Sequence, residues 1–168
     1  GNSRAIGGLA ADRVFIDAQA WAVLARCGTA KQRELALENV LTKCAGEPAH
    51  RIMSAPYQPP PPADISRCRT PAGTGFNGGV SPAAVAWLVW ALAEAGHKDK
   101  ALRIWENLAL RTLAERFPSA ARGTTDQDGC LAAGMAPFPA GNRTISPHLW
   151  AWQHFAMKKI HEHRRETV

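Results

Sequence analysis

Apolar residues recur at helical spacing in five segments of the chain, and no segment shows a convincing alternating pattern of a β-strand. The predicted helices are Asp17 to Arg26, Ala30 to Cys44, Ala83 to Ala95, Lys98 to about Glu115, and a last one that starts near Pro147. Short connections join the first four into two antiparallel helical hairpins. The pattern therefore predicts an all-α fold of two hairpins followed by a half hairpin.

The same spacing predicts which side of each amphipathic helix is buried. The expected buried stripes are Ala18, Trp21, Ala22 and Ala25 in the first helix; Leu37, Val40, Leu41 and Cys44 in the second; Ala101, Ile104, Trp105 and Leu108 in the fourth; and Leu149, Trp152, Ala156 and Ile160 in the fifth. Thr29 is placed to cap the second helix, and Gly28 and Gly46 are placed to end the first and the second.

The third predicted helix is apolar almost all round its circumference. Ser81 is placed to cap it, Pro82 occupies a first position where a missing N–H costs nothing, and Gly96 closes it. A helix that is apolar on every side is expected to be buried on every side. This helix is therefore predicted to lie in an inner layer.

Two long irregular stretches, Glu47 to Val80 and Arg116 to Ser146, separate these hairpins. Loops of about 30 residues are uncommon inside a compact domain unless they are functional or disordered. The first stretch carries a proline run, Pro59 to Pro62, that is predicted to be a stiff spacer. Because the two hairpins share one layout, the sequence favours a toroid or solenoid of hairpins whose two long loops emerge on one face.

Length and charge place limits on the partners. The chain has 168 residues, so we expect a single all-α domain over residues 1–168. Twenty Lys and Arg against fourteen Asp and Glu give a net charge of +6, but the basic residues are scattered and accompany no nucleic-acid-binding module. No apolar run approaches the roughly 18 residues of a membrane span, and the N-terminus lacks the apolar segment of a secretory signal. We therefore expect a soluble, cytoplasmic protein without a nucleic-acid or membrane partner.

Metal and nucleophile chemistry have little support in the sequence. The cysteines are far apart and are expected to be reduced thiols: Cys27, Cys44, Cys68 and Cys130. His161 and His163 lie two apart on a predicted helix, where their side chains diverge, so no metal site is expected. Asp126 and Asp128 form either a catalytic carboxylate pair, a calcium loop that lacks its glutamate, or an Asx-turn pair, and the last interpretation is favoured.

Three segments, taken in order, resemble the glycoside phosphorylases of glycoside hydrolase family 94, the cellobiose and chitobiose phosphorylase group. The first is RVFIDAQAWAVL at residues 13–24. The second is FNGG at residues 76–79, followed at the family's spacing by an apolar helix with Trp87 and then by GHKDKAL at residues 96–102. The third is the final aromatic helix around Trp150. The resemblance covers about Ala11 to Ile160.

This resemblance implies that the chain corresponds to the C-terminal part of a catalytic (α/α)6 barrel, which six hairpins close. It implies action on β-linked gluco-oligosaccharides, with inorganic phosphate as a candidate co-substrate and no other cofactor. It also implies a sugar site lined by Asp17, Gln19, Asn77, Gly78 and Gly79. The catalytic residue stays unknown, because the family's general acid lies in an Asp-Trp-Asn type motif upstream of the matched region, and this sequence contains no such motif.

The chain departs from the family where the family contacts phosphate. The family's histidine after Asn-Gly-Gly is Ala83 here, its preceding glutamate is Phe76, and the stretch aligned with its hydroxyl-bearing turn is 145–148. Phosphate recognition needs charge-assisted donors that converge on its oxygens. We therefore expect the isolated chain to be inactive as a phosphorylase.

Each candidate site residue also has a structural interpretation. Asp17 either contacts a sugar or caps the first helix. The Asn77–Gly79 stretch either presents its amide and backbone groups to a sugar or forms a turn that needs positive φ. The tryptophans are expected to pack in the core rather than stack on sugars. They are Trp21, Trp87, Trp90, Trp105, Trp150 and Trp152.

The alternative function is a non-catalytic helical-hairpin module for binding or oligomerisation. Five helices do not close a barrel of six hairpins, so an inner helix such as Ala83 to Ala95 would keep an unpaired apolar side. We therefore expect a homo-oligomer, or a partner chain that completes the barrel.

Overall fold

The computed structural model describes residues 13–46, 49–58, 71–109, 112, 115 and 147–165, and the side chains of its last helix from 151 to 162. Its helices are α1 (Ile16–Leu24), α2 (Ala30–Lys43), α3 (Pro82–Glu94), α4 (Lys98–Leu108) and α7 (Pro147–Arg165). Over the described ranges, extended backbone pairs only in isolated bridges, as between Phe15 and Met53. The prediction of an all-α fold with these five helices is confirmed.

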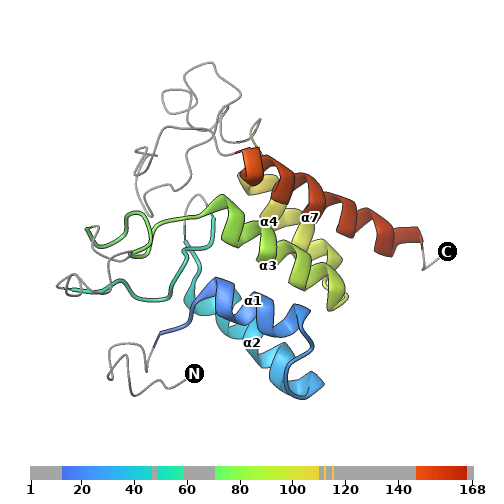
Figure 1. Cartoon of the computed structure of the whole chain (residues 1–168), viewed down its shortest axis with the longest axis horizontal. Coiled ribbons are helices and arrows are strands. Elements are labelled where there is room, and N and C mark those ends of the chain that lie inside the picture. Colours follow the sequence, from blue (N-terminus) through green and yellow to red (C-terminus); the bar gives the residue numbers. More distant parts are fainter. Residues whose placement is uncertain are drawn as a thin grey trace.

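The helices are arranged in two layers (Figure 1). The inner layer consists of α1, α3 and α7, which lie side by side with α3 in the middle. In the outer layer, α2 packs on α1, and α4 packs on α3 and also contacts α7. The two hairpins therefore have the same inner–outer layout, as their sequences predict. Closure of such layers into a toroid stays a prediction.

The middle helix α3 forms the centre of the core. Ten of its thirteen residues are buried, including Leu88 and Leu92, because α1, α4 and α7 all contact it. The Ser81 hydroxyl accepts a hydrogen bond from the Ala84 amide at 3.4 Å, and Pro82 stands in the first turn. The predicted cap, first residue and buried position of this helix are therefore confirmed.

The start of α2 is fixed by a capping box. The Thr29 hydroxyl accepts a hydrogen bond from the Gln32 amide, and the Gln32 side chain accepts one from the Thr29 amide. These two bonds satisfy backbone donors that the first turn of a helix leaves without partners. The predicted cap at Thr29 is confirmed, and Leu37, Val40 and Cys44 are buried as predicted.

Both inner helices of the hairpins end in a Schellman motif, in which a residue with left-handed backbone reverses the chain after the last turn. That residue is Arg26 (φ 54°) after α1 and Gly96 (φ 87°) after α3. Gly96 ends its helix as predicted, whereas the prediction that Gly28 ends the first helix is wrong, because the chain already reverses at Arg26. The paired amide-to-carbonyl bonds are Arg26 to Val23 and Cys27 to Ala22 in the first motif, and Gly96 to Ala93 and His97 to Leu92 in the second. The structural repeat therefore extends to individual hydrogen bonds.

Two further sequence predictions about helix faces and ends are wrong. In α1 the buried residues are Ile16, Ala20 and Val23, whereas Ala18 and Trp21 of the predicted stripe are exposed. This helix is apolar on most sides, so its periodicity does not identify the side that meets α2 and α3. In the second case, α4 ends at Leu108 rather than near residue 115, because Ala109 adopts an extended backbone (φ −58°, ψ 135°). No glycine or proline marks that end in the sequence.

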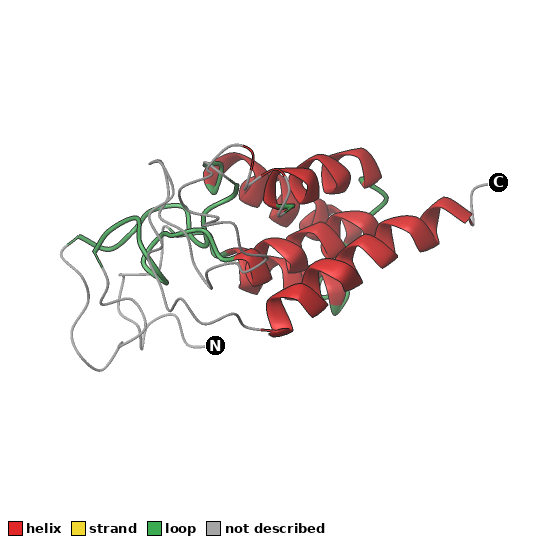
Figure 2. Cartoon of the chain, turned by 90° about the horizontal axis from the view of Figure 1, so that it is seen from above, coloured by secondary structure: helices red, strands yellow, loops and turns green. Residues whose placement is uncertain are grey.

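The loop segments 49–58 and 71–81 gather at the end of the helices where α1 and α3 begin, as Figure 2 shows. The described parts of the first long loop therefore lie at the N-terminal end of the inner layer. The predicted spacer Pro59 to Pro62 and the second long stretch, Arg116 to Ser146, lie outside the described residues.

Candidate functional site

Segment 49–58 ties the beginning of α1 to the beginning of α3. The Ile16 amide donates to the Ile52 carbonyl at 3.0 Å, and the Ile52 amide donates to the Gly79 carbonyl at 2.8 Å. Residue 52 thus connects the start of α1, which carries Asp17 and Gln19, with the turn that contains Asn77. The structure brings these predicted site residues to the same end of the inner layer.

The Asn77 side chain is fully buried and bonded to backbone. Its Oδ1 accepts from the Tyr57 amide at 2.7 Å, and its Nδ2 donates to the Tyr57 carbonyl at 3.1 Å. Burying an amide is favourable only when its donor and acceptor are satisfied, and both are satisfied here. In this structure the side chain therefore fastens segment 49–58 to the turn before α3.

The two glycines after Asn77 complete this turn. Gly78 has φ 90°, and a Cβ there would lie 3.0 Å from the Pro56 Cβ, so both the backbone angle and the close approach favour glycine. Gly79 is buried, and its carbonyl accepts the bond from Ile52. The turn interpretation of Asn77–Gly79 thus has direct geometric support, and sugar contact by these residues stays a prediction.

Asp17 and Gln19 lie half-buried in the first turn of α1. The N-cap position of this helix is Phe15, which makes no side-chain capping bond. The interpretation of Asp17 as the cap is therefore wrong. The Asp17 Oδ1 accepts a hydrogen bond from the neighbouring Ala18 amide at 2.8 Å. Its negative charge is stabilised by the positive N-terminal end of the helix dipole.

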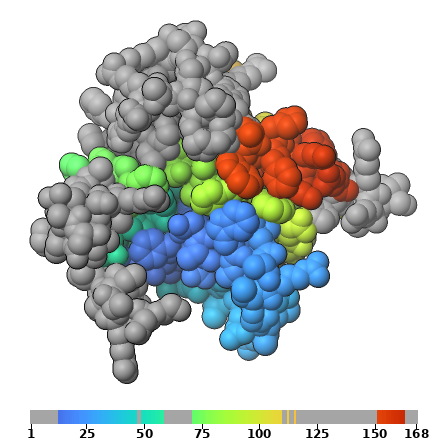
Figure 3. Space-filling model, in the orientation of Figure 1, coloured from blue at the N-terminus to red at the C-terminus, as the bar shows by residue number. Residues whose placement is uncertain are grey.

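The open side of the inner layer carries a cluster of five aromatic rings, which we call the aromatic face. Its members are Trp21 on α1, Trp87 and Trp90 on α3, and Trp152 and Phe155 on α7. Figure 3 shows α1, α3 and α7 next to one another on one side of the molecule, with α2 beside α1. The aromatic face therefore joins all three inner helices on the side opposite the outer layer.

The rings of this cluster pack closely on one another. Trp21 lies 5.7 Å from Trp87, 5.9 Å from Trp90 and 6.2 Å from Trp152 between ring centroids. Edge-to-face contacts at such distances are the favourable ones for aromatic pairs. Trp21 is still 40% exposed, and the other four rings are half-buried. Trp87, Trp105 and Trp152 pack against the buried core as predicted, whereas the prediction that Trp21 is a core residue is wrong. The side chain of Trp150 lies outside the described residues.

Polar groups accompany the aromatic face. The Trp90 indole N–H donates to the Glu94 carboxylate at 3.0 Å, and the Lys159 ammonium lies 5.4 Å from the Phe155 ring centroid. The Trp87 indole nitrogen is buried and finds no acceptor in the described part of the chain. A buried N–H without an acceptor is costly, so this nitrogen is a local source of instability in the described structure.

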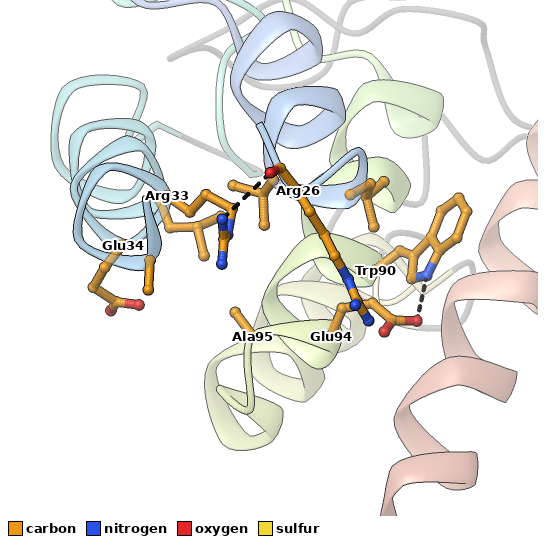
Figure 4. Close-up of a pocket in the computed structure, with 10 residues that line it drawn as sticks. Arg26, Arg33, Glu34, Trp90, Glu94 and Ala95 are labelled. Carbon is orange, nitrogen blue, oxygen red and sulfur yellow. Dashed lines mark hydrogen bonds between the residues drawn. The ribbon is translucent and has the colours of Figure 1, made fainter. Parts of the chain in front are cut away.

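A pocket of about 460 Å³ lies at the opposite end of the inner layer from the loops, where α1 and α3 end and α2 begins (Figure 4). Its lining residues are Val23, Leu24, Arg26, Ala30, Arg33, Glu34, Leu37, Trp90, Glu94 and Ala95. Sequence analysis did not single out this pocket. One feature of the sequence could have pointed to it. When the two hairpins are aligned, Arg26 falls at the position of Gly96, and arginine is unusual at a left-handed position that ends a helix.

Metal and membrane signals are absent over the ranges that the structure covers. No group of three or more His, Cys, Asp or Glu side chains there is arranged to hold a metal ion. No helix in those ranges is long and apolar enough to cross a membrane. The loop acids Asp126 and Asp128 lie outside the described residues, as do Cys68 and Cys130.

Comparison with known proteins gives no family for this chain. A scan of protein-family models and a search of curated proteins each found no match. The resemblance to family 94 therefore stays a prediction from the sequence.

Proposed function

We propose that this chain is a carbohydrate-active protein that resembles part of an inverting β-glucoside phosphorylase and binds a β-linked gluco-oligosaccharide on its aromatic face. The observation that carries the proposal is the exposed ring of Trp21 within a five-ring cluster spanning the three inner helices. The family 94 resemblance supplies the substrate class. Binding to this face adds the aromatic residues to the site expected from the sequence.

Physical chemistry favours a sugar on this surface. Pyranose rings present C–H groups on one face and hydroxyls at the rim, so they need an apolar platform with polar groups beside it. Trp21 and Trp90 supply such a platform, and the Glu94 carboxylate beside Trp90 supplies a hydrogen-bond acceptor. The loop end with Asp17 and Gln19 is joined to the same helix as Trp21.

Catalysis by this chain alone is not part of the proposal. Cleavage of a glycosidic bond needs a protonated general acid with a raised pKa. We expect no phosphate-dependent release of glucose 1-phosphate from cellobiose by the 168-residue chain, and measurable release would overturn this expectation.

A sugar titration tests the binding proposal. Cellobiose and longer β-linked gluco-oligosaccharides are titrated to tens of millimolar while intrinsic tryptophan fluorescence is recorded, with sucrose as a sugar of different linkage. We expect a saturable change with the β-linked sugars that weakens at least tenfold in Trp21→Ala. Leu35→Ala is the matched control, because Leu35 is a 55% exposed apolar residue on α2, away from the aromatic face. A flat titration, or equal weakening in both variants, would refute the proposal.

The second candidate is the non-catalytic oligomerisation module, and the exposed ring of Trp21 favours it too. A partly exposed aromatic cluster is the kind of surface that a second copy covers. Sedimentation equilibrium separates the two functions. If Trp21 mediates self-association, the wild-type chain sediments as a dimer, Trp21→Lys as a monomer and Leu35→Lys as a dimer.

A further inference from the structure

We infer that the pocket between the ends of α1 and α3 and the start of α2 binds a small organic anion, with Arg26 and Arg33 holding its carboxylate or phosphate group. The pocket shares Trp90 and Glu94 with the surface proposed to bind sugar, whereas Arg26 and Arg33 line the pocket and take no part in the sugar proposal. Its volume of about 460 Å³ falls within the usual range for small-molecule sites.

Arg33 supplies a guanidinium held in place for such a ligand. Its Nη1 donates to the Gly28 carbonyl at 2.7 Å and to the Arg26 carbonyl at 3.4 Å, and these bonds anchor the half-buried side chain at the end of α1. No described residue engages its Nε and Nη2 donors. A guanidinium fixed along one edge presents the other edge to an oxyanion at little conformational cost.

Arg26 supplies the second guanidinium, from a backbone position that is unfavourable for a residue with a Cβ. It occupies the left-handed position of a Schellman motif with φ 54°, where a residue with a Cβ is disfavoured. The equivalent position after α3 is Gly96. Within the described part of the chain, no hydrogen bond or ion pair engages the Arg26 guanidinium. Figure 4 shows this side chain extending across the pocket toward Glu94.

The two acidic residues of the lining already have partners. The Glu34 carboxylate lies 2.8 Å from the His97 Nε2, and the Glu94 carboxylate accepts the Trp90 indole N–H at 3.0 Å. The carbonyls of Leu92 and Ala93 at the end of α3 are likewise taken up by the Schellman bonds. Both carboxylates keep their negative charge, so anion binding depends on local placement: the open edge of the Arg33 guanidinium, the Arg26 guanidinium, and the N-terminus of α2 at Ala30.

The rest of the lining determines the body of the ligand. Trp90 and several aliphatic side chains form the apolar part of the pocket. An anion without an apolar portion would leave this part unfilled, so we expect a ring or a short hydrocarbon chain attached to the charged group.

The test uses the full chain, calorimetric titration and four ring probes of similar size. Benzoate and phenyl phosphate carry the two anionic groups, benzyl alcohol is the neutral control and benzylammonium the cationic control. We expect saturable binding of at least one anion, with the neutral and cationic probes at least tenfold weaker. Comparison of the two anions tells which group the pocket prefers. Absence of saturable anion binding, or equal binding of benzylammonium, would overturn the inference.

Arg26→Gly gives a second test, because this variant is expected to stay folded and any loss of binding can then be assigned to the missing side chain. Glycine suits the left-handed position, so this variant should melt about 2–4 °C higher than wild type. It should also bind the anion at least tenfold more weakly, because a charge-assisted hydrogen bond is lost. Arg103→Ala, which removes an exposed charge of α4 outside the pocket, should bind like wild type. A lower melting temperature in Arg26→Gly, unchanged binding in that variant, or equal weakening in Arg103→Ala would contradict the role of Arg26.

Discussion

The hairpins α1–α2 and α3–α4 share one plan, with an inner helix that ends in a Schellman motif and an outer helix that packs on it. They differ in how far the inner helix is enclosed. α3 has neighbours on both sides in its layer and buries ten of thirteen residues, whereas α1 has one such neighbour and buries three of nine. Both helices are rich in apolar residues. Position in the layer, rather than composition, therefore decides how much of an inner helix is buried.

The largest expected difference between the hairpins follows from this enclosure. Leu88→Ala in α3 removes a side chain with no exposed surface and should lower the free energy of unfolding by about 3 kcal/mol. The same change at Leu24, which is half-buried at the end of α1, should cost about 1 kcal/mol. Urea denaturation followed by circular dichroism measures both. Equal costs at the two positions would mean that α1 is as enclosed as α3.

The next largest difference is expected between the segments that precede α1 and α3, in the free energy of unfolding lost when one side-chain bond partner is removed. Asn77→Ala removes both side-chain bonds to Tyr57 and leaves buried backbone groups without partners, which should cost about 2–3 kcal/mol. At the entrance to α1, the Ser54 hydroxyl accepts a single bond from the Val14 amide at 3.0 Å. Ser54→Ala should therefore cost about 1 kcal/mol. A smaller loss for Asn77→Ala than for Ser54→Ala would break this comparison.

The Schellman motif after α3 allows the reverse substitution to the one proposed at the end of α1. A Cβ on Gly96 would meet nothing within 4 Å, so Gly96→Ala isolates the cost of a left-handed backbone at φ 87°. We expect a loss of about 1 kcal/mol in the free energy of unfolding, measured in urea. The gain expected for Arg26→Gly should be similar in size and opposite in sign. A neutral Gly96→Ala would remove the argument that Arg26 is strained.

The smallest effect concerns the segment that follows α2. Burial lowers the pKa of His50 below its ordinary value of 6.5, although a hydrogen bond to the Leu41 backbone acts in the opposite direction. The fold thus favours the neutral imidazole. The contribution of His50 to the free energy of unfolding is complete above pH 6.5 and is lost as the pH falls from 6.5 toward the lower pKa of the folded state. Melting temperatures between pH 7.5 and 5.5 should fall less steeply in His50→Gln. An identical slope in both proteins would exclude His50 as the cause.

The helices were predictable because their signals are local. Thr29, Ser81 and Pro82 mark helix starts through bonds within one turn, and the continuous apolar pattern of α3 fixes its place in the core. The exposed side of α1 was not predictable, because an apolar helix at the edge of a layer and one in the middle have similar sequences. The burial of Asn77 also depends on a residue twenty positions earlier, Tyr57, which no local pattern reveals.

The candidate site was likewise predictable only where its signals are local in the sequence. The sequence brought attention to Asp17, Gln19 and Asn77, and the structure places them at one end because Ile52 bonds to both neighbouring segments. The aromatic face and the Arg26 pocket arise from side chains on three different helices. Their meeting depends on how the layers pack, so only the coordinates reveal them.

The packing of Trp21 between α3 and α7 has an optical consequence. Indole rings with centroids 5.7–6.2 Å apart couple their electronic transitions, and the coupling weakens steeply as the rings move apart. The chain should therefore show an exciton couplet in its far-ultraviolet dichroism. Loss of that couplet while helical ellipticity persists would identify undocking of α1 from its neighbours before the helices melt.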